Sequence, residues 1–249
     1  MEEILKAISG YLSFRNDYDS FLLYANEIRG ENSGYNFNDN RLNPDIFMET
    51  SESRNMQYNW TTSKSIDELE SNIRNCMKCK LGATRKKFVF GSGNPNADIV
   101  VVGEAPGADE DEQGLPFVGR AGQLLTKILA SIELERDQVY ICNILKCRPP
   151  GNRNPEIDEI ESCEPYLKKQ IELINPKLIL ALGKFAAQTL LQTKQPLGKL
   201  RETLHDYQGV KTIVTFHPAA LLRNPNWKIL TWADVKFLRK EYDKILQNG

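Results

Sequence analysis

The feature of this sequence that most limits its fold is an alternation of short apolar runs with longer amphipathic stretches. Because neighbouring parallel strands need a crossover connection, usually a helix, this order predicts an α/β fold. We expect a three-layer α/β/α sandwich with a central four-stranded parallel sheet. The strand-like runs are residues 98–102, 139–144, 177–182 and 212–216, and the helical stretches are residues 123–132, 155–174 and 184–191.

The first quarter of the chain has a different character. Residues 2–28 carry apolar positions compatible with one or two helices, and residues 30–63 are rich in Asn, Ser and Asp with little periodicity. Ser65 and Glu68 fit a capping box, which predicts a helix leading toward Cys76. We therefore expect residues 1–64 to be an accessory helical segment and flexible polar linker, and residues 65–249 to form the main domain.

Charge also divides the chain. Residues 1–65 carry 6 Lys/Arg against 10 Asp/Glu, which leaves 26 against 23 in the remainder. A mildly basic body gives little support by itself for nucleic-acid binding, because phosphate contacts need a local basic surface. The start of the sequence lacks a basic region followed by a long apolar run, and no later run approaches membrane-spanning length. We expect a cytoplasmic protein without a membrane partner.

Four of the five cysteines have a spacing typical of metal ligands. Cys76 and Cys79 form C-x2-C, Cys147 and Cys163 form C-x15-C, and Cys142 lies in an apolar run. In a reducing compartment such spacing favours a metal site over disulfides. Thiolates hold both zinc and iron–sulfur clusters, so the spacing leaves the metal open.

Three loops follow predicted strands, where the ligand sites of parallel sheets lie. Residues 103–122 combine glycines with acidic side chains, so that the backbone could pass close to a ligand. Residues 143–155 leave a strand with an amide, a thiol and cationic groups, and residues 216–225 place a histidine at a strand end. Each loop also has a purely structural interpretation: an acidic surface turn, an Asn bonded to its own backbone, or a structural His.

Taken together, the loops and the cysteine spacing resemble the family 4 uracil-DNA glycosylases, the iron–sulfur branch of that superfamily. The motifs are G-E-A-P-G at 103–107, K-C-R-P-P at 146–150 and H-P-A-A-L-L-R at 217–223, and the resemblance runs from about residue 65 to residue 246. It implies a uracil-DNA glycosylase-like fold. It also implies a [4Fe–4S] cluster on Cys76, Cys79, Cys147 and Cys163.

The resemblance implies a DNA repair enzyme that flips uracil out of DNA and hydrolyses its N-glycosidic bond, leaving an abasic site. Phe117 would stack on the base, and Asn143 would read its edge with one donor and one acceptor. His217 would donate a hydrogen bond to the carbonyl oxygen that gains negative charge. The implied uracil-binding set is Gly103, Phe117, Asn143 and His217.

The group that activates water is less clearly marked. Ala105 stands where the best-known branch of the superfamily has an Asp, so Glu104 and Glu110 are the remaining carboxylates, and the expected catalytic set is Glu104, Glu110 and His217. For DNA binding we expect Leu221 or Leu222 as a wedge. Arg223, with Lys146 or Arg148, would contact phosphates.

The expected substrate is uracil-containing DNA, single- or double-stranded, bound by a monomer. Residues 1–64 could bind a repair or replication partner. The matched loops hold no obvious Lys nucleophile, which favours hydrolysis over a Schiff-base lyase reaction. The alternative function is a non-catalytic nucleic-acid-binding module of the same fold, in which the bound metal holds the loops together.

Overall fold

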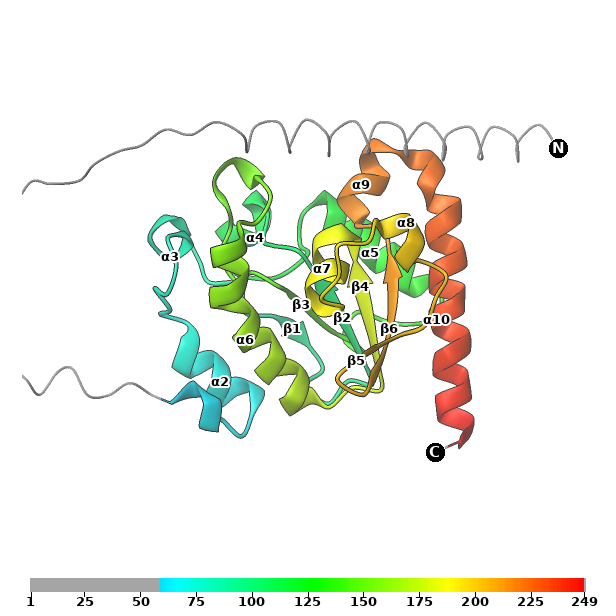
Figure 1. Cartoon of the computed structure of the whole chain (residues 1–249), viewed down its shortest axis with the longest axis horizontal. Helices are drawn as coiled ribbons and strands as arrows, with labels where there is room; N and C mark the ends of the chain where they lie inside the picture. The colour runs from blue at the N-terminus through cyan, green and yellow to red at the C-terminus, as the bar shows by residue number, and fades with distance from the viewer. Residues whose placement is uncertain (1–58, 249) are drawn as a thin grey trace, which may run out of the picture. The chain divides into compact units, whose positions relative to one another are not determined.

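The computed structural model describes residues 59–248 (Figure 1), so most of the expected accessory segment 1–64 lies outside the described residues. Six strands form one sheet in the order β1-β3-β2-β4-β6-β5. The four inner strands are parallel, as predicted. They are β2 (Ile99–Gly103), β3 (Tyr140–Asn143), β4 (Leu178–Leu182) and β6 (Val210–Thr215).

The two edge strands were not predicted. β1 (Ser92–Gly93) pairs antiparallel with β3, and β5 (His205–Tyr207) pairs antiparallel with β6. Both are too short to show an apolar alternation, and each depends on the neighbouring strand for its hydrogen bonds. The central sheet is therefore a mixed six-stranded one around the predicted parallel core.

The helices fill the stretches between strands where the sequence predicted them. The α-helices are α2 (Ile66–Ile73), α3 (Leu81–Thr84), α4 (Ala108–Gln113), α5 (Arg120–Ala130), α6 (Ile157–Ile174), α7 (Gly183–Leu190), α8 (Leu197–Leu200), α9 (Pro218–Arg223) and α10 (Lys228–Asn248); the 3-10 turns are η2 (Trp60–Thr62), η3 (Pro150–Asn152) and η4 (Pro225–Trp227). None of the helices within residues 59–248 is both long and apolar enough to cross a membrane.

The predicted cap starts α2. The Ser65 hydroxyl accepts a hydrogen bond from the Glu68 N–H at 3.1 Å, while the Glu68 carboxylate reaches back to the Lys64 N–H at 2.8 Å. Upstream of this cap, the Trp60 ring packs edge-on against Tyr166 of α6, with ring centroids 4.8 Å apart. The packed body therefore extends to Trp60, a few residues before the expected boundary at residue 65.

Both faces of the sheet are covered. Val100 and Val102 of β2 belong to a core shared with α2, α6, α7 and α8, whereas Ile99 and Val101 belong to a second core shared with α5 and α10. A strand buried on both faces has no polar side, which is why the sequence shows continuous apolar runs. This arrangement confirms the three-layer sandwich.

The parallel core places the three candidate loops at one edge. Gly103 ends β2 opposite Asn143, which ends β3, and β6 leads through His217 into α9. In Figure 1 this edge lies near the top, where α9 is labelled. The loops converge because the strands that precede them run in the same direction.

Candidate active site

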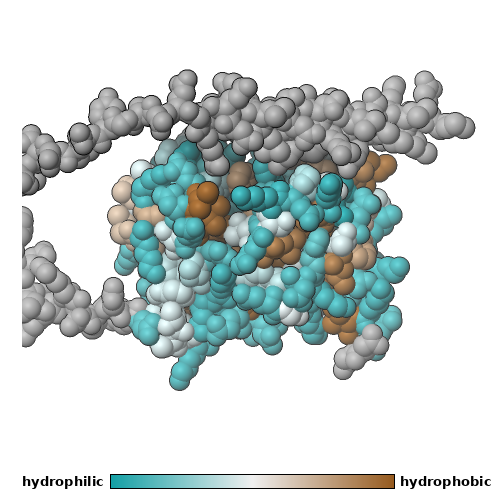
Figure 2. Space-filling view, in the orientation of Figure 1, coloured by the Kyte–Doolittle hydropathy of each residue, from teal (hydrophilic) through white to brown (hydrophobic). Residues whose placement is uncertain are grey.

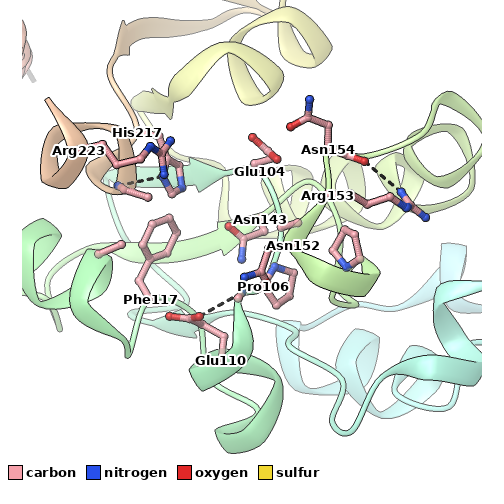
Figure 3. Close-up of a pocket in the computed structure, with 15 residues that line it drawn as sticks. Glu104, Pro106, Glu110, Phe117, Asn143, Asn152, Arg153, Asn154, His217 and Arg223 are labelled. Atoms are coloured by element: carbon pink, nitrogen blue, oxygen red, sulfur yellow. Dashed lines mark hydrogen bonds between the residues drawn. The ribbon is translucent and has the colours of Figure 1, made fainter.

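A pocket of about 320 Å3 opens at this edge of the sheet, and all three loops line it (Figure 3). It contains most of the predicted catalytic and base-binding side chains. Four further residues of the 143–155 loop also line it. The principal lining side chains are Glu104, Glu110, Phe117, Asn143, Pro149, Asn152, Arg153, Asn154, His217 and Arg223.

Gly103 lies behind this pocket and allows two other side chains to approach each other. A β-carbon at this position would lie 2.3 Å from Asn143 Oδ1 and 2.5 Å from Phe117 Cζ, far inside van der Waals contact. Only glycine leaves that space open. The first glycine of the G-E-A-P-G motif therefore shapes the pocket through Phe117 and Asn143.

Phe117 is held in an unusual conformation by the loop around it. Its φ is 52°, in the left-handed region that a bulky residue rarely adopts, and its side chain is 6% exposed. The Glu110 carboxylate accepts hydrogen bonds from the N–H groups of Val118 at 2.9 Å and Gly119 at 3.0 Å. Such a conformation costs on the order of 1–3 kcal/mol and persists only where surrounding contacts enforce it.

Glu110 also accepts the Gly107 N–H at 3.1 Å, which caps α4. With three backbone donors bound, its carboxylate fixes the loop that carries Phe117. These contacts favour a positioning role for Glu110, and its expected catalytic role stays a prediction.

Asn143 is buried with part of its amide unpaired. Its side chain is 2% exposed, and Oδ1 has no hydrogen-bond partner among the described residues. Leaving a buried polar group unpaired costs about 1–3 kcal/mol. An amide held at this cost on the wall of a pocket is available for a ligand.

His217 is fixed as a hydrogen-bond donor. Its Nδ1 accepts the Ala219 N–H at 3.2 Å, so the proton of the neutral ring lies on Nε2. Burial and the charge of Arg223 lower the pKa of His217 to about 4, against the opposing effect of Glu110. Near neutral pH the ring is uncharged, and its Nε2–H is free to donate. The Phe117 and His217 ring centroids lie 5.5 Å apart.

The carboxylate best suited to accept a proton in this pocket is Glu104. Burial raises the pKa of Glu104 from 4.5 to about 7, although the charges of Arg223 and Lys184 act to lower it. No hydrogen bond to its carboxylate is formed within the part of the chain that the structure describes, and Figure 3 shows the group facing the pocket. A carboxylate with a pKa near 7 can act as a base at neutral pH.

Comparison with known proteins identifies the family. Residues 90–238 match the family model of the uracil DNA glycosylase superfamily. A type-4 uracil-DNA glycosylase of Archaeoglobus fulgidus is 45% identical over 188 residues, which cover 72% of this chain and 89% of that protein. The chain belongs to the type-4 uracil-DNA glycosylase family. The resemblance inferred from the motifs is thereby confirmed.

Two further relatives, one of type 4 and one of type 5, are also similar to this chain. A type-4 uracil-DNA glycosylase of Thermotoga maritima is 43% identical over 167 residues, covering 66% of this chain and 87% of that protein. A type-5 uracil-DNA glycosylase of Pyrobaculum aerophilum is 32% identical over 149 residues, which cover 52% of this chain and 64% of that protein. The similarity is greater to the type-4 proteins.

In this type-4 glycosylase two of the expected DNA contacts are wrong. Lys146 is fully buried, and its Nζ donates hydrogen bonds to the Asn143 carbonyl oxygen at 2.8 Å and to the Gln170 side chain. It therefore supports the carboxyl end of β3 from within and, being buried, is not available to a phosphate. Leu221 is likewise 0% exposed, which excludes it as a wedge, whereas Leu222 is 38% exposed.

Two cationic candidates remain accessible near the pocket. Arg223 is exposed and lines the pocket, and the half-buried Arg148 donates from Nε to Asn152 Oδ1 at 2.8 Å. Arg153 is held by Glu159 through hydrogen bonds of 2.9 and 2.5 Å. We did not assign Asn152, Arg153 and Asn154 to the site from the sequence, although the concentration of polar groups in residues 148–155 signalled them.

The four spaced cysteines of this type-4 glycosylase pack in one region of the core. Cys147 and Cys163 are buried, Cys76 and Cys79 are half-buried, and all four are free thiols. Three of the sulfurs accept hydrogen bonds: Cys76 from the Tyr166 hydroxyl at 3.2 Å, Cys147 from Arg85 at 3.4 Å and Cys163 from the Lys146 N–H at 3.3 Å.

By ligand type, soft sulfur donors with such support suit an iron–sulfur cluster or zinc. Within residues 59–248, no group of three His, Cys, Asp or Glu side chains is arranged to hold a single metal ion. Cys142 is buried in β3, as its apolar surroundings predicted.

Proposed function

We propose that this protein acts in base excision repair by hydrolysing the bond between uracil and deoxyribose in DNA, which leaves an abasic site. One observation carries the proposal: the pocket gathers an aromatic ring, an unpaired buried amide, a neutral histidine donor and a carboxylate with a raised pKa. The identity to type-4 uracil-DNA glycosylases supports the same activity.

Recognition of the base would use two side chains that Gly103 allows to meet. A uracil flipped from the stack would lie on the Phe117 ring, a contact worth about 1–3 kcal/mol in other nucleic-acid binders. The Asn143 amide offers an acceptor and donors to the ring N–H and a carbonyl of uracil. Pairing with uracil would also remove the cost of the unpaired Oδ1 atom.

Cleavage of the glycosidic bond transfers its electron pair to the base. His217 Nε2–H would donate to the uracil carbonyl oxygen on which the negative charge collects, and a neutral ring can do this without giving up its proton. Water adds to C1′ of the sugar as the bond to nitrogen breaks. The Glu104 carboxylate would orient that water and take its proton, which later passes to the departing base or to solvent.

We propose that Cys76, Cys79, Cys147 and Cys163 hold a [4Fe–4S] cluster, as the family relationship implies. When bound, the cluster would act as a cross-link rather than as a redox group. Cys147 follows Asn143 by four residues, and Cys163 lies on α6. Ligation would tie the base-reading loop to α6 and to the segment after α2.

The substrate is proposed to be uracil in single- or double-stranded DNA, bound by a monomer. Arg148, Leu222 and Arg223, the last of which lines the pocket, are the proposed contacts to DNA beyond the flipped base. Residues 1–64 are proposed to bind a repair or replication partner. Because Trp60 packs against Tyr166, the truncation that tests this removes residues 1–57 only, and base release by that chain should match that of the full chain.

The deciding experiment is single-turnover release of free uracil from a uracil-containing single-stranded oligonucleotide. His217→Ala should slow release about 100- to 1000-fold, the usual effect of removing one donor to a developing anion. His205→Ala is the matched control, because the His205 side chain on β5 hydrogen-bonds to the Leu200 carbonyl oxygen of α8 at 2.7 Å and does not line the pocket. Binding without release by the wild type would instead favour the non-catalytic module.

A further inference from the structure

A second concave surface lies between α5, α9 and α10. This groove has a volume of about 190 Å3 and a largely apolar floor. Trp232 of α10 forms one side and remains 42% exposed, an unusual degree of exposure for a tryptophan. The groove is lined by Leu124, Lys127, Ile128, Ser131, Leu221, Lys228, Thr231, Trp232 and Val235.

One polar atom in the groove lacks a partner. Thr231 is 2% exposed, and its hydroxyl forms no hydrogen bond within residues 59–248. A hydroxyl on a helix commonly bonds to the carbonyl one turn earlier, so an unpaired buried one is informative. It offers a donor and an acceptor to a ligand that enters the groove.

The rim of the groove is cationic. Lys127 of α5 and Lys228 of α10 line it, and Lys236 places its Nζ 5.4 Å from the centre of the Trp232 ring. None of these three lysines forms an ion pair with a carboxylate in the described part of the chain. Residues 228, 232 and 236 recur at four-residue intervals on α10, which places them on one face of the helix.

α9 separates this groove from the catalytic pocket. Leu221 of α9 lines the groove, whereas Ala219 and Arg223 of the same helix line the pocket, and Leu222 is exposed. Figure 1 shows α9 near the upper end of α10, into which the chain leads through η4. Figure 2 shows apolar residues interspersed with hydrophilic ones on the side of the molecule where α10 lies. A DNA strand that leaves the pocket over α9 would reach the groove next.

We propose that this groove binds a nucleotide that flanks the uracil on the same strand. The base would stack on Trp232 with its edge near the Thr231 hydroxyl, and the phosphates would lie near Lys127, Lys228 and Lys236. An aromatic platform with surrounding cations is the usual way in which proteins hold single-stranded DNA. The inference rests on the proposed function and extends it from the flipped base to the adjoining strand.

DNA is the favoured occupant for two reasons. The lysines, which have no carboxylate partner among the described residues, complement phosphate charge, and Leu221 in the groove is next in sequence to the proposed DNA contacts Leu222 and Arg223 of α9. Because the groove lies on one side of the pocket, it should serve only one of the two flanks of the uracil. This asymmetry supplies the test.

The experiment compares two single-stranded oligonucleotides, one extended 5′ of the uracil and the other extended 3′. Steady-state uracil release gives KM and kcat for the wild type and for Trp232→Ala. We expect the substitution to raise KM about ten-fold for one oligonucleotide and to leave the other unaffected, in line with the loss of one base–aromatic stack. Trp232→Phe, which retains a ring, should restore most of the lost affinity.

The lysines are tested through the salt dependence of binding. The double variant Lys228→Ala/Lys236→Ala should reduce the slope of log affinity against log salt by about 1.4 for the responsive oligonucleotide, since each single-strand phosphate contact contributes about 0.7. The control Lys177→Ala/Lys211→Ala removes the same charge at the amino-terminal ends of β4 and β6, at the opposite edge of the sheet.

Equal KM values and equal salt slopes for all variants would overturn the inference and would leave the groove to a protein partner. Failure of the proposed function would look different, because the wild type would then release no uracil from either oligonucleotide.

Discussion

Replacement of Glu104 by Gln should make the protein more stable and less active, and the gain in stability should depend on pH. The difference between the ordinary pKa of 4.5 and the folded pKa of about 7 corresponds to about 3.4 kcal/mol of unfavourable ionisation. Because the side chain is partly open to solvent in the pocket, screening reduces the effect, and we expect about 1–3 kcal/mol.

The direction of the pH dependence follows from the sign of the shift. A carboxyl whose pKa is raised on folding favours the folded state fully below pH 4.5 and loses that contribution as the pH rises through 7. Gln is neutral throughout. The melting temperature of Glu104→Gln should therefore equal that of the wild type near pH 4.5 and exceed it by about 3–10 °C above pH 7, since 1 kcal/mol is worth about 2–4 °C in a domain of this size.

Thermal unfolding monitored by circular dichroism from pH 4.5 to 8.5 measures this difference. The control is Glu112→Gln, an exposed glutamate whose pKa is lowered by a hydrogen bond from Lys86, which should give no stabilisation at any pH. In single-turnover assays Glu104→Gln should lose about 100- to 10,000-fold in rate. The wild-type rate should rise with pH toward a plateau above 7, because His217 is already neutral above about pH 4.

Two results would refute this reasoning. A stability difference that does not change with pH would mean that Glu104 is not held with a raised pKa. A variant with the wild-type rate would mean that the carboxylate neither orients water nor accepts its proton.

Three other substitutions test the site. Leu222→Ala should slow uracil release from duplex DNA without changing the melting temperature. Leu221→Ala should instead destabilise the fold by about 2–5 kcal/mol. The reverse pattern would contradict the assignment of Leu222 as the wedge. Gly103→Ala should displace Phe117 and Asn143 and weaken uracil binding in a KM measurement while the circular dichroism spectrum stays native; an unchanged KM would contradict the close packing. The purified protein should contain about four iron atoms per chain and absorb broadly in the visible range. Cys147→Ser should lose both properties. Tightly bound zinc in place of iron would overturn the cluster assignment.

Adjacent residues within one motif differ in ways that no sequence pattern indicates. In K-C-R-P-P, Lys146 is fully buried against Gln170 while Arg148 remains partly accessible. A lysine is almost always at the surface, so the residue type alone predicted the wrong environment for Lys146. Its position is fixed by a partner on α6, 24 residues away in the sequence.

The carboxylates illustrate the same division. Sequence reasoning left both Glu104 and Glu110 as candidates, because both follow β2 in an acidic loop. Glu110 is occupied by three backbone N–H groups from its own loop, whereas Glu104 faces the pocket and its pKa is raised by burial. Hydrogen-bond occupancy and burial depend on the folded surroundings, so they separate two residues that look alike in the sequence.

The sequence by itself determined the parallel core, the convergence of the three loops and the family. These follow from local apolar runs, from the strand direction that helical crossovers impose, and from motifs in a fixed order. Tertiary structure alone decided which leucine is exposed, which cation is accessible, which carboxylate has its pKa raised, and that β1 and β5 complete the sheet. Each of these depends on contacts between segments far apart in the chain, where neither periodicity nor spacing carries information.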